Sequence, residues 1–241
     1  MNTWVLQRNS SRALVEMGLL ALIIGTYNNL TNLLPSDVHD ITYVPVNLAF
    51  LGILLAWVLG KSNLSAADIG LRRDNILSSL KWGALIGILI PAPLFILAAV
   101  QDLVWRVGVD DPRIVGMTLG TLLYRVLIRI PLGTALFEEL LFRGILYGRL
   151  ITLTNFTRTA LITSGVFALW HITPTLNVFR DSDAFSSDML LGLAFVGALF
   201  GTFLGGLMFA FIRYRTNSVA GCVAAHGLIN SLATVAFYIR G

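Results

Sequence analysis

The sequence PLGTALFEELLFRG, residues 131–144, sets two adjacent glutamates and an arginine within an otherwise apolar segment. Ionisable side chains inside an apolar span are costly, so their presence indicates a function or a partner. On a helix, Glu139 and Arg143 lie one turn apart on one face and can form an ion pair, whereas Glu138 points about 100° away. We therefore expect Glu139 and Arg143 to neutralise each other and Glu138 to be free for chemistry. The alternative is a charge cluster that only holds helices together.

The rest of the chain is equally apolar. Of its 241 residues, 56% are apolar and only 12% are charged, and the mean hydropathy is +0.79. Soluble domains carry about 25% charged residues, so lipid must be the solvent for much of this chain. The composition excludes an ordinary soluble enzyme and gives no indication of a nucleic-acid partner. The single cysteine, Cys222, excludes an internal disulfide.

Apolar segments of the length that a bilayer-spanning helix needs recur along the chain. There are seven of them, at roughly 13–34, 41–60, 79–100, 121–149, 157–173, 189–212 and 217–239. Helix breakers and charges lie between them, and no second domain or low-complexity segment is evident. The sequence thus predicts an all-α, polytopic membrane protein with about seven transmembrane helices, within a range of six to eight.

The distribution of Lys and Arg predicts the orientation, because cytoplasmic loops carry more of both. Ten of the 17 lie on the side of the N-terminus, four lie on the other side, and three lie within the fourth segment. We expect a multi-pass protein of the cell (plasma) membrane with its N-terminus in the cytoplasm and its C-terminus outside. Glu16, at the cytoplasmic end of the first segment, is expected to be incidental.

Two of the three histidines lie in predicted spans. His171 ends the fifth segment, and His226 lies in the seventh, one turn before Asn230. Counted from the basic residues at the cytoplasmic ends of their helices, Glu138, His171 and His226 lie at depths of about 16, 20 and 16 Å. Side chains that only pack need not share a layer, whereas the members of one polar site must. His39, in the first linker, is expected to be an ordinary loop residue.

A carboxylate, two imidazoles and a carboxamide suit hydrolysis by an activated water. Glu138, aided by His171, would take a proton from the water, and His226 and Asn230 would donate hydrogen bonds to the oxyanion. No cofactor is required in this first interpretation. In the second, Glu138, His171 and His226 hold a divalent metal such as zinc, although the H-E-x-x-H motif is missing. A nucleophilic pair of Cys222 and His226 is the third.

These residues resemble the signature of a known family, the CPBP (CAAX-protease and bacteriocin-processing, or Abi) intramembrane peptidases, whose type member is the type II CAAX prenyl endopeptidase. The family pattern is E-E-x-x-x-R, then F-x-x-x-H, then H-x-x-x-N. The chain has EELLFR at 138–143, FALWH at 167–171 and HGLIN at 226–230. Residues 68–73 (DIGLRR) and 80–83 (LKWG) are also similar to the linker that precedes the family's core.

The resemblance implies a single membrane domain, in which N-terminal helices (1–64) precede a helical core (65–241) around an intramembrane cavity. It implies catalytic roles for four residues and supporting roles for three more, namely Glu138, His171, His226 and Asn230, and then Glu139, Arg143 and Phe167. It further implies an endopeptidase that acts on a membrane-associated protein or peptide. The substrate would be the C-terminal tripeptide of a prenylated protein or a bacterial precursor peptide.

Two other functions stay open from the sequence. One is a non-catalytic membrane protein, such as an immunity factor or a scaffold that binds membrane peptides. The other is a transporter that uses the polar layer as an ion site, although no inverted repeat is evident.

Small and imide residues predict how two of the helices pack. Gly197, Gly201 and Gly205 form a stripe on the sixth segment, where small residues let helix backbones approach closely in lipid. We expect this stripe to pack within the chain, and a homodimer face is the alternative. Pro91 and Pro93 are expected to kink the third segment.

Overall fold

The computed structural model describes residues 3–62, 64–92, 116–180 and 188–240, and within these ranges it contains helices and no strand. Several predictions fall outside the described residues. They concern Pro93, the remainder of the third segment to residue 100, and Arg106 and Arg113, two of the four basic residues counted on the side away from the N-terminus. Nothing in the structure bears on these positions.

Every predicted apolar segment is largely helical over its described part. The helices are α1 (Thr3–Thr31), α2 (Ser36–Lys61), α3 (Ile76–Leu89), α5 (Leu119–Tyr124), η1 (Arg125–Leu136), α6 (Phe137–Glu139), η2 (Leu140–Leu146), α7 (Tyr147–Leu150), α8 (Phe156–Trp170), α9 (Ile172–Arg180), α10 (Asp188–Thr216) and α11 (Ala220–Arg240). Elements α5 to α7 form one continuous helix, 119–150, called the central helix below. The central helix, α2, α10 and α11 are each long and apolar enough to cross a membrane. The all-α, multi-pass fold is therefore confirmed.

Much of the central helix has the wider π form, in which each N–H donates to the carbonyl five residues back. Pro131 lies inside η1 and has no N–H, so the carbonyl of Val126 loses that donor. The hydroxyl of Ser231 on α11 donates to this carbonyl at 3.3 Å instead. The proline therefore ties the central helix to α11, which carries His226.

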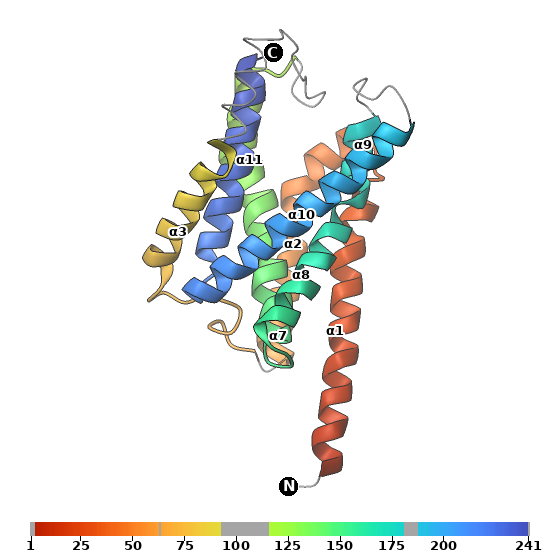
Figure 1. Cartoon of the computed structure of the whole chain (residues 1–241), viewed down its shortest axis with the longest axis vertical. Coiled ribbons are helices and arrows are strands. Elements are labelled where there is room, and N and C mark those ends of the chain that lie inside the picture. The colour runs from red at the N-terminus through yellow and green to blue at the C-terminus, as the bar shows by residue number, and fades with distance from the viewer. Residues whose placement is uncertain (1–2, 63, 93–115, 181–187, 241) are drawn as a thin grey trace.

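Glycines allow two close helix contacts. A Cβ at Gly83 of α3 would overlap the backbone of Gly221 of α11, and the Gly221 N–H donates to the Ser79 hydroxyl at 2.8 Å. A Cβ at Gly206 of α10 would lie 2.8 Å from the Cβ of Ser164 of α8. Figure 1 shows α3 beside α11, and α10 crossing the molecule next to α8.

The small-residue stripe does not pack within the described chain, so that expectation was wrong. A Cβ at Gly197, Gly201 or Gly205 would meet nothing within 4 Å among the neighbouring residues. The next residue, Gly206, makes the close contact because the face of α10 that meets α8 is turned by one position. The homodimer alternative for the stripe stays a prediction.

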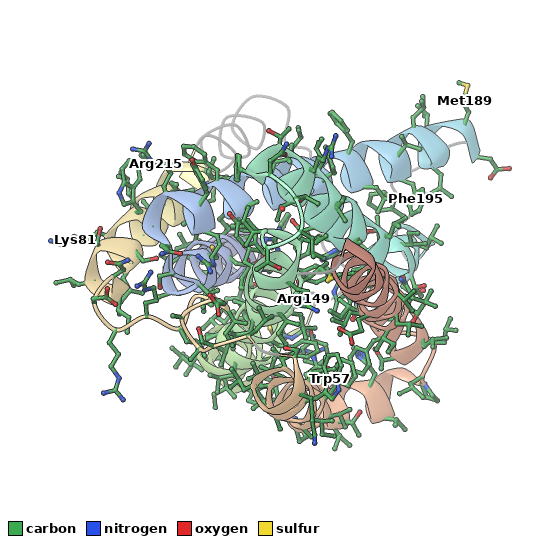
Figure 2. The ribbon with its side chains drawn as sticks, turned by 90° about the horizontal axis from the view of Figure 1, so that it is seen from below. Trp57, Lys81, Arg149, Met189, Phe195 and Arg215 are labelled. Carbon is green, nitrogen blue, oxygen red and sulfur yellow. The ribbon has the colours of Figure 1, made fainter. Side chains whose placement is uncertain are left out.

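Two residues that were expected to have no role are part of the fold. His39 lies in α2 and not in a linker, because this helix begins directly after Pro35, whose carbonyl accepts from the His39 N–H at 2.9 Å. Glu16 is also not incidental, since its carboxylate accepts a hydrogen bond from Arg149 of α7 at 3.1 Å and so joins α1 to the central helix. Figure 2 shows Arg149 near the middle of the molecule when it is seen from below, with Trp57 of α2 nearby.

Basic residues predicted to share one side of the membrane lie toward one end of the molecule. Figure 1 shows α7 and the end of α10 that carries Arg215 on the half of the long axis where α1 begins, whereas α11 ends on the other half. The regular part of α3 ends at Leu89, but Ile90 keeps helical dihedral angles (φ −67°, ψ −48°), and Pro91 and Ala92 are again helical. The helix is thus interrupted just before Pro91, and the predicted kink of the third segment stays a prediction because the segment continues outside the described residues.

Candidate active site

Glu138 lies at the middle of the central helix and faces the protein interior, with only 3% of its surface exposed. Its Oε2 atom lies 3.8 Å from Nε2 of His171 and 4.0 Å from Nε2 of His226. Within the part of the chain that the structure describes, this oxygen has no hydrogen-bond partner. The three side chains that the sequence placed in one layer therefore meet, and they come from three separate helices.

His171 occupies the break between α8 and α9. It is the C-cap of α8, with φ −96° and ψ 6°, and its side chain is 24% exposed. Its Nδ1 atom lies 2.8 Å from the carbonyl oxygen of Phe167, which can only accept, so Nδ1 carries the proton. In the neutral ring Nε2 then has a free lone pair, and this atom is the one that faces Glu138.

Glu139 is shared by two cations or donors. Its Oε1 atom accepts from Arg143 Nη1 at 3.2 Å, which confirms the expected ion pair, and from His226 Nδ1 at 2.8 Å. Both Glu139 and Arg143 are fully buried. Arg143 Nη2 also donates to the carbonyl of Gly206 on α10 at 3.0 Å. The second contact of Glu139 was not predicted, and it fixes the ring of His226 with Nε2 toward Glu138.

Aromatic rings enclose these polar groups. The Phe167 ring lies 4.3 Å from the guanidinium carbon of Arg143 and packs edge-on against His171, with ring centroids 4.7 Å apart. Phe209 of α10 stacks on His226 at 5.1 Å. A guanidinium over a ring face is stabilised by the ring's quadrupole, and more so away from water. Phe167 thus supports the site through its carbonyl and its ring together.

The linker that resembles the one before the family's core packs under the central helix. Arg213 of α10 donates to the carbonyl of Asp68 at 2.8 Å and, through Nε, to the carbonyl of Arg143 at 3.1 Å. Gly70 has φ +79°, a conformation that glycine adopts without strain. A Cβ there would also lie 2.7 Å from Arg213 Nε. Arg213 therefore joins the linker to the backbone of Arg143 in the central helix.

The remaining predicted residues take different positions. Asn230 is half-buried one turn after His226, and in the described chain no side-chain hydrogen bond joins it to Glu138, His171 or His226. Cys222 is fully buried, and its thiol donates to the carbonyl of Phe209 at 3.2 Å. This contact gives the thiol a packing role and leaves His226 paired with Glu139, so the geometry does not support a cysteine–histidine nucleophile.

The three side chains do not fit a metal ion as they are arranged. Ligands of a tetrahedral zinc ion at its usual bond lengths lie about 3.4 Å from one another. Glu138 Oε2 is farther than this from both Nε2 atoms, at 3.8 and 4.0 Å. Among the residues that the structure describes, no group of three His, Cys, Asp or Glu side chains could hold a metal ion. This arrangement therefore supports no step through a metal ion.

Residues 120–232 match the family model described as "Type II CAAX prenyl endopeptidase Rce1-like". The match begins with the central helix and ends just after Asn230, so it contains all three motifs. The resemblance to the CAAX-protease family is confirmed. An Rce1-like segment supports a CAAX-type intramembrane endopeptidase, and hence a hydrolase, in general terms. No curated protein and no solved structure matches the chain.

Some residues at this Rce1-like site were not predicted from the sequence. Gly206 and Phe209 hold Arg143 and His226 from α10, and nothing in their local sequence marks them apart from other apolar positions. Asn28 and Asn29 contact the helix break at His171 from α1. These two could have been found, because adjacent carboxamides inside an apolar helix are as unusual as the buried histidines.

Proposed function

We propose that this protein is an intramembrane endopeptidase in which Glu138, aided by His171, activates a water molecule for attack on a peptide carbonyl. The observation that carries the proposal is the approach of Glu138 Oε2 to Nε2 of both imidazoles, at 3.8 and 4.0 Å. These separations are too long for direct hydrogen bonds and short enough for one water to bridge. If a water lay about 2.8 Å from both atoms of either pair, its two hydrogen bonds would form an angle of about 90° at the water oxygen.

The hydrogen bonds on the far side of each ring support this assignment. The Nδ1–H of His171 donates a hydrogen bond to the Phe167 carbonyl, so Nε2 keeps a free lone pair. This lone pair can accept a proton from the same water that Glu138 binds. As the water oxygen forms a bond to the scissile carbon, its proton moves to Glu138 or to His171. That proton then passes to the leaving amine when the carbon–nitrogen bond breaks.

Charge balance within the site favours a doubly protonated His226. With His226 doubly protonated, Glu138 and Glu139 carry two negative charges, and Arg143 and His226 carry two positive charges. A neutral cluster avoids the cost of an unpaired charge away from water. His226 then donates from Nδ1 to Glu139 and directs an Nε2–H toward Glu138. This N–H can stabilise the oxyanion of the tetrahedral intermediate.

Asn230 is proposed as the second donor to the oxyanion. It lies one turn from His226 on α11, and its half-buried side chain is not engaged by Glu138 or by either imidazole. A carboxamide N–H is a suitable donor for developing negative charge. The pair His226 and Asn230 would therefore act from one helix on one oxygen.

The substrate and the orientation in the membrane extend this proposal. The family match favours a protein with a CAAX-type C-terminus, cleaved after the prenylated cysteine, and a bacterial precursor peptide is the other candidate. We propose the plasma membrane, with the N-terminus in the cytoplasm, a core from residue 65 and N-terminal helices before it. A non-catalytic immunity or scaffold protein is the alternative function.

The test compares wild type, Glu138→Gln and Glu16→Gln in proteoliposomes. The probe is a synthetic farnesylated peptide ending in a C-a-a-X sequence, with a fluorophore and a quencher on either side of the bond after the cysteine. Loss of the general base should lower kcat by about 10²- to 10⁴-fold. The Glu16→Gln control, the same substitution outside the site, should retain activity. A folded Glu138→Gln protein with full cleavage would refute the proposed base.

Two further measurements separate the open alternatives. Comparative peptidomics of membranes that contain the active protein or Glu138→Ala would identify a substrate even if the farnesylated probe is not cleaved. Treatment with EDTA should leave activity unchanged under the metal-free mechanism. Loss of activity with recovery on added zinc would assign the three side chains to a metal instead.

A further inference from the structure

The break between α8 and α9, where His171 lies, is bridged by a side chain from α1. In an uninterrupted helix the N–H of Thr173 would donate to the carbonyl of Leu169. Here the Asn29 carboxamide stands between them, with its Oδ1 accepting from Thr173 N–H at 2.8 Å and its Nδ2 donating to Leu169 O at 2.8 Å. One side chain thus replaces one backbone hydrogen bond and holds the helix open.

Asn28, the preceding residue of α1, bonds to a second backbone group at the same break. In a continuous helix the carbonyl of Trp170 would accept from the residue four positions later, which is Pro174 and has no N–H. The Nδ2 of Asn28 donates to this carbonyl at 3.1 Å, and the Asn28 side chain is buried. In lipid an unsatisfied carbonyl costs several kcal/mol, so the break needs these two carboxamides.

We propose that Asn29, together with Asn28, positions His171 for the proposed reaction, which makes α1 part of the active site. His171 lies between the two carbonyls and the N–H that the asparagines bind, so the direction of its ring depends on this backbone. The bent backbone lets Nδ1 reach the Phe167 carbonyl while Nε2 faces Glu138. The inference rests on the proposed function, and it extends the site beyond residues 120–232, where the family match ends.

Other contacts of α1 with this region do not explain the arrangement. Asn177 of α9 donates to the Asn32 carbonyl at 3.1 Å, which joins α9 to α1 without touching the end of α8. Among the described residues, Thr26 bonds only to carbonyls of its own helix. Both residues therefore provide controls, because they lie on the same two helices and leave the break intact.

The experiment is a double-mutant cycle between Asn29 and His171, measured with the farnesylated peptide in proteoliposomes. Asn29→Leu keeps the size of the side chain and removes both hydrogen bonds to the break, together with the one that Nδ2 donates to the Gly25 carbonyl of its own helix. A displacement of a catalytic group by about 1 Å can lower the rate by about 10²-fold, so kcat should fall by about 10- to 100-fold while KM changes little. Thr26→Ala and Asn177→Ala should retain kcat.

In a His171→Ala background the same Asn29→Leu change should cost less than about 2-fold, because a positioning residue has nothing left to position. An equal loss in both backgrounds would show a merely structural role and overturn the inference. If His171→Ala itself left kcat unchanged, the proposed function would fail instead, and the two failures are distinct. Should Asn29→Leu not fold, Asn29→Ser is measured in the same cycle, with the same two outcomes.

Discussion

Replacing Gly206 with alanine should separate α8 from α10 and thereby disturb Arg143, which bonds to the Gly206 carbonyl. The added Cβ would lie 2.8 Å from the Cβ of Ser164 and 3.0 Å from its Cα, where ordinary contacts begin at 3.4 Å. The helices must therefore move apart by at least about 0.6 Å, because the backbone atom cannot rotate away. Overpacking of this kind costs about 1–3 kcal/mol.

The displacement also weakens a hydrogen bond to the buried guanidinium. Arg143 Nη2 donates to the carbonyl of Gly206 at 3.0 Å, and a shift of this size would lengthen the bond by up to about 0.6 Å, which takes it toward the limit of hydrogen-bonding distance. A hydrogen bond to a charged group contributes about 1.5–3 kcal/mol. Since the two effects share one movement and do not simply add, we expect a loss of about 2–4 kcal/mol in the free energy of unfolding.

Thermal unfolding in detergent micelles measures the effect, and a loss of this size should lower Tm by about 5–15 °C. Gly205→Ala is the matched control, because the adjacent Cβ would meet nothing within 4 Å. That variant should be as stable as wild type or slightly more so, since alanine favours helix over glycine. Ser164→Gly in the Gly206→Ala background should recover part of the loss. Equal Tm values for the two alanine variants would refute the packing argument.

Three further predictions use the same measurements. Arg143→Met leaves the buried Glu139 carboxylate with His226 in place of two partners and should lower the free energy of unfolding by about 3–5 kcal/mol, measured by denaturation in micelles. Gly83→Ala would overlap the backbone of α11, so α3 should separate from α11, detected as faster proteolysis of the linker before α3. The Ser65 hydroxyl and N–H hold the pKa of Asp68 below its usual value. Ser65→Ala should therefore lower stability at neutral pH, and this difference should disappear as the pH falls through the wild-type pKa of Asp68.

The sequence predicted the members of the site better than the contacts that hold them. Glu138, His171 and His226 could be found because ionisable groups are rare in apolar spans and because their depths could be counted along helices. Their partners are backbone carbonyls and ring faces, such as the Phe167 carbonyl, which bonds to His171 Nδ1. Every residue carries a carbonyl, so no sequence pattern indicates which one will accept.

Departures from regular helix geometry produced contacts that the sequence did not predict. Helical periodicity assumes an unbroken ladder, but Pro131 and Pro174 each remove an N–H, and the freed carbonyls bond to Ser231 and Asn28 from other helices. The stripe around Gly205 was expected to face another helix, and the contact falls on Gly206. Which face of α10 is buried depends on α8, and the two pack through tertiary contacts that local sequence does not specify.

The buried charges account for why assembly and the proposed chemistry depend on the same bonds. A soluble hydrolase can leave the far side of a catalytic group to water, whereas groups in lipid must find every partner within the protein. Here one chain of hydrogen bonds runs from the Gly206 carbonyl through Arg143 and Glu139 to His226, and it joins α10, the central helix and α11. Removing the side chain of Arg143, Glu139 or His226 breaks a contact between helices and also changes the charge beside Glu138. If a substitution at one of these residues lowers activity, the loss is informative about catalysis only when folding is measured on the same sample. Alternatively, a double-mutant cycle can separate the effect on catalysis from the effect on folding.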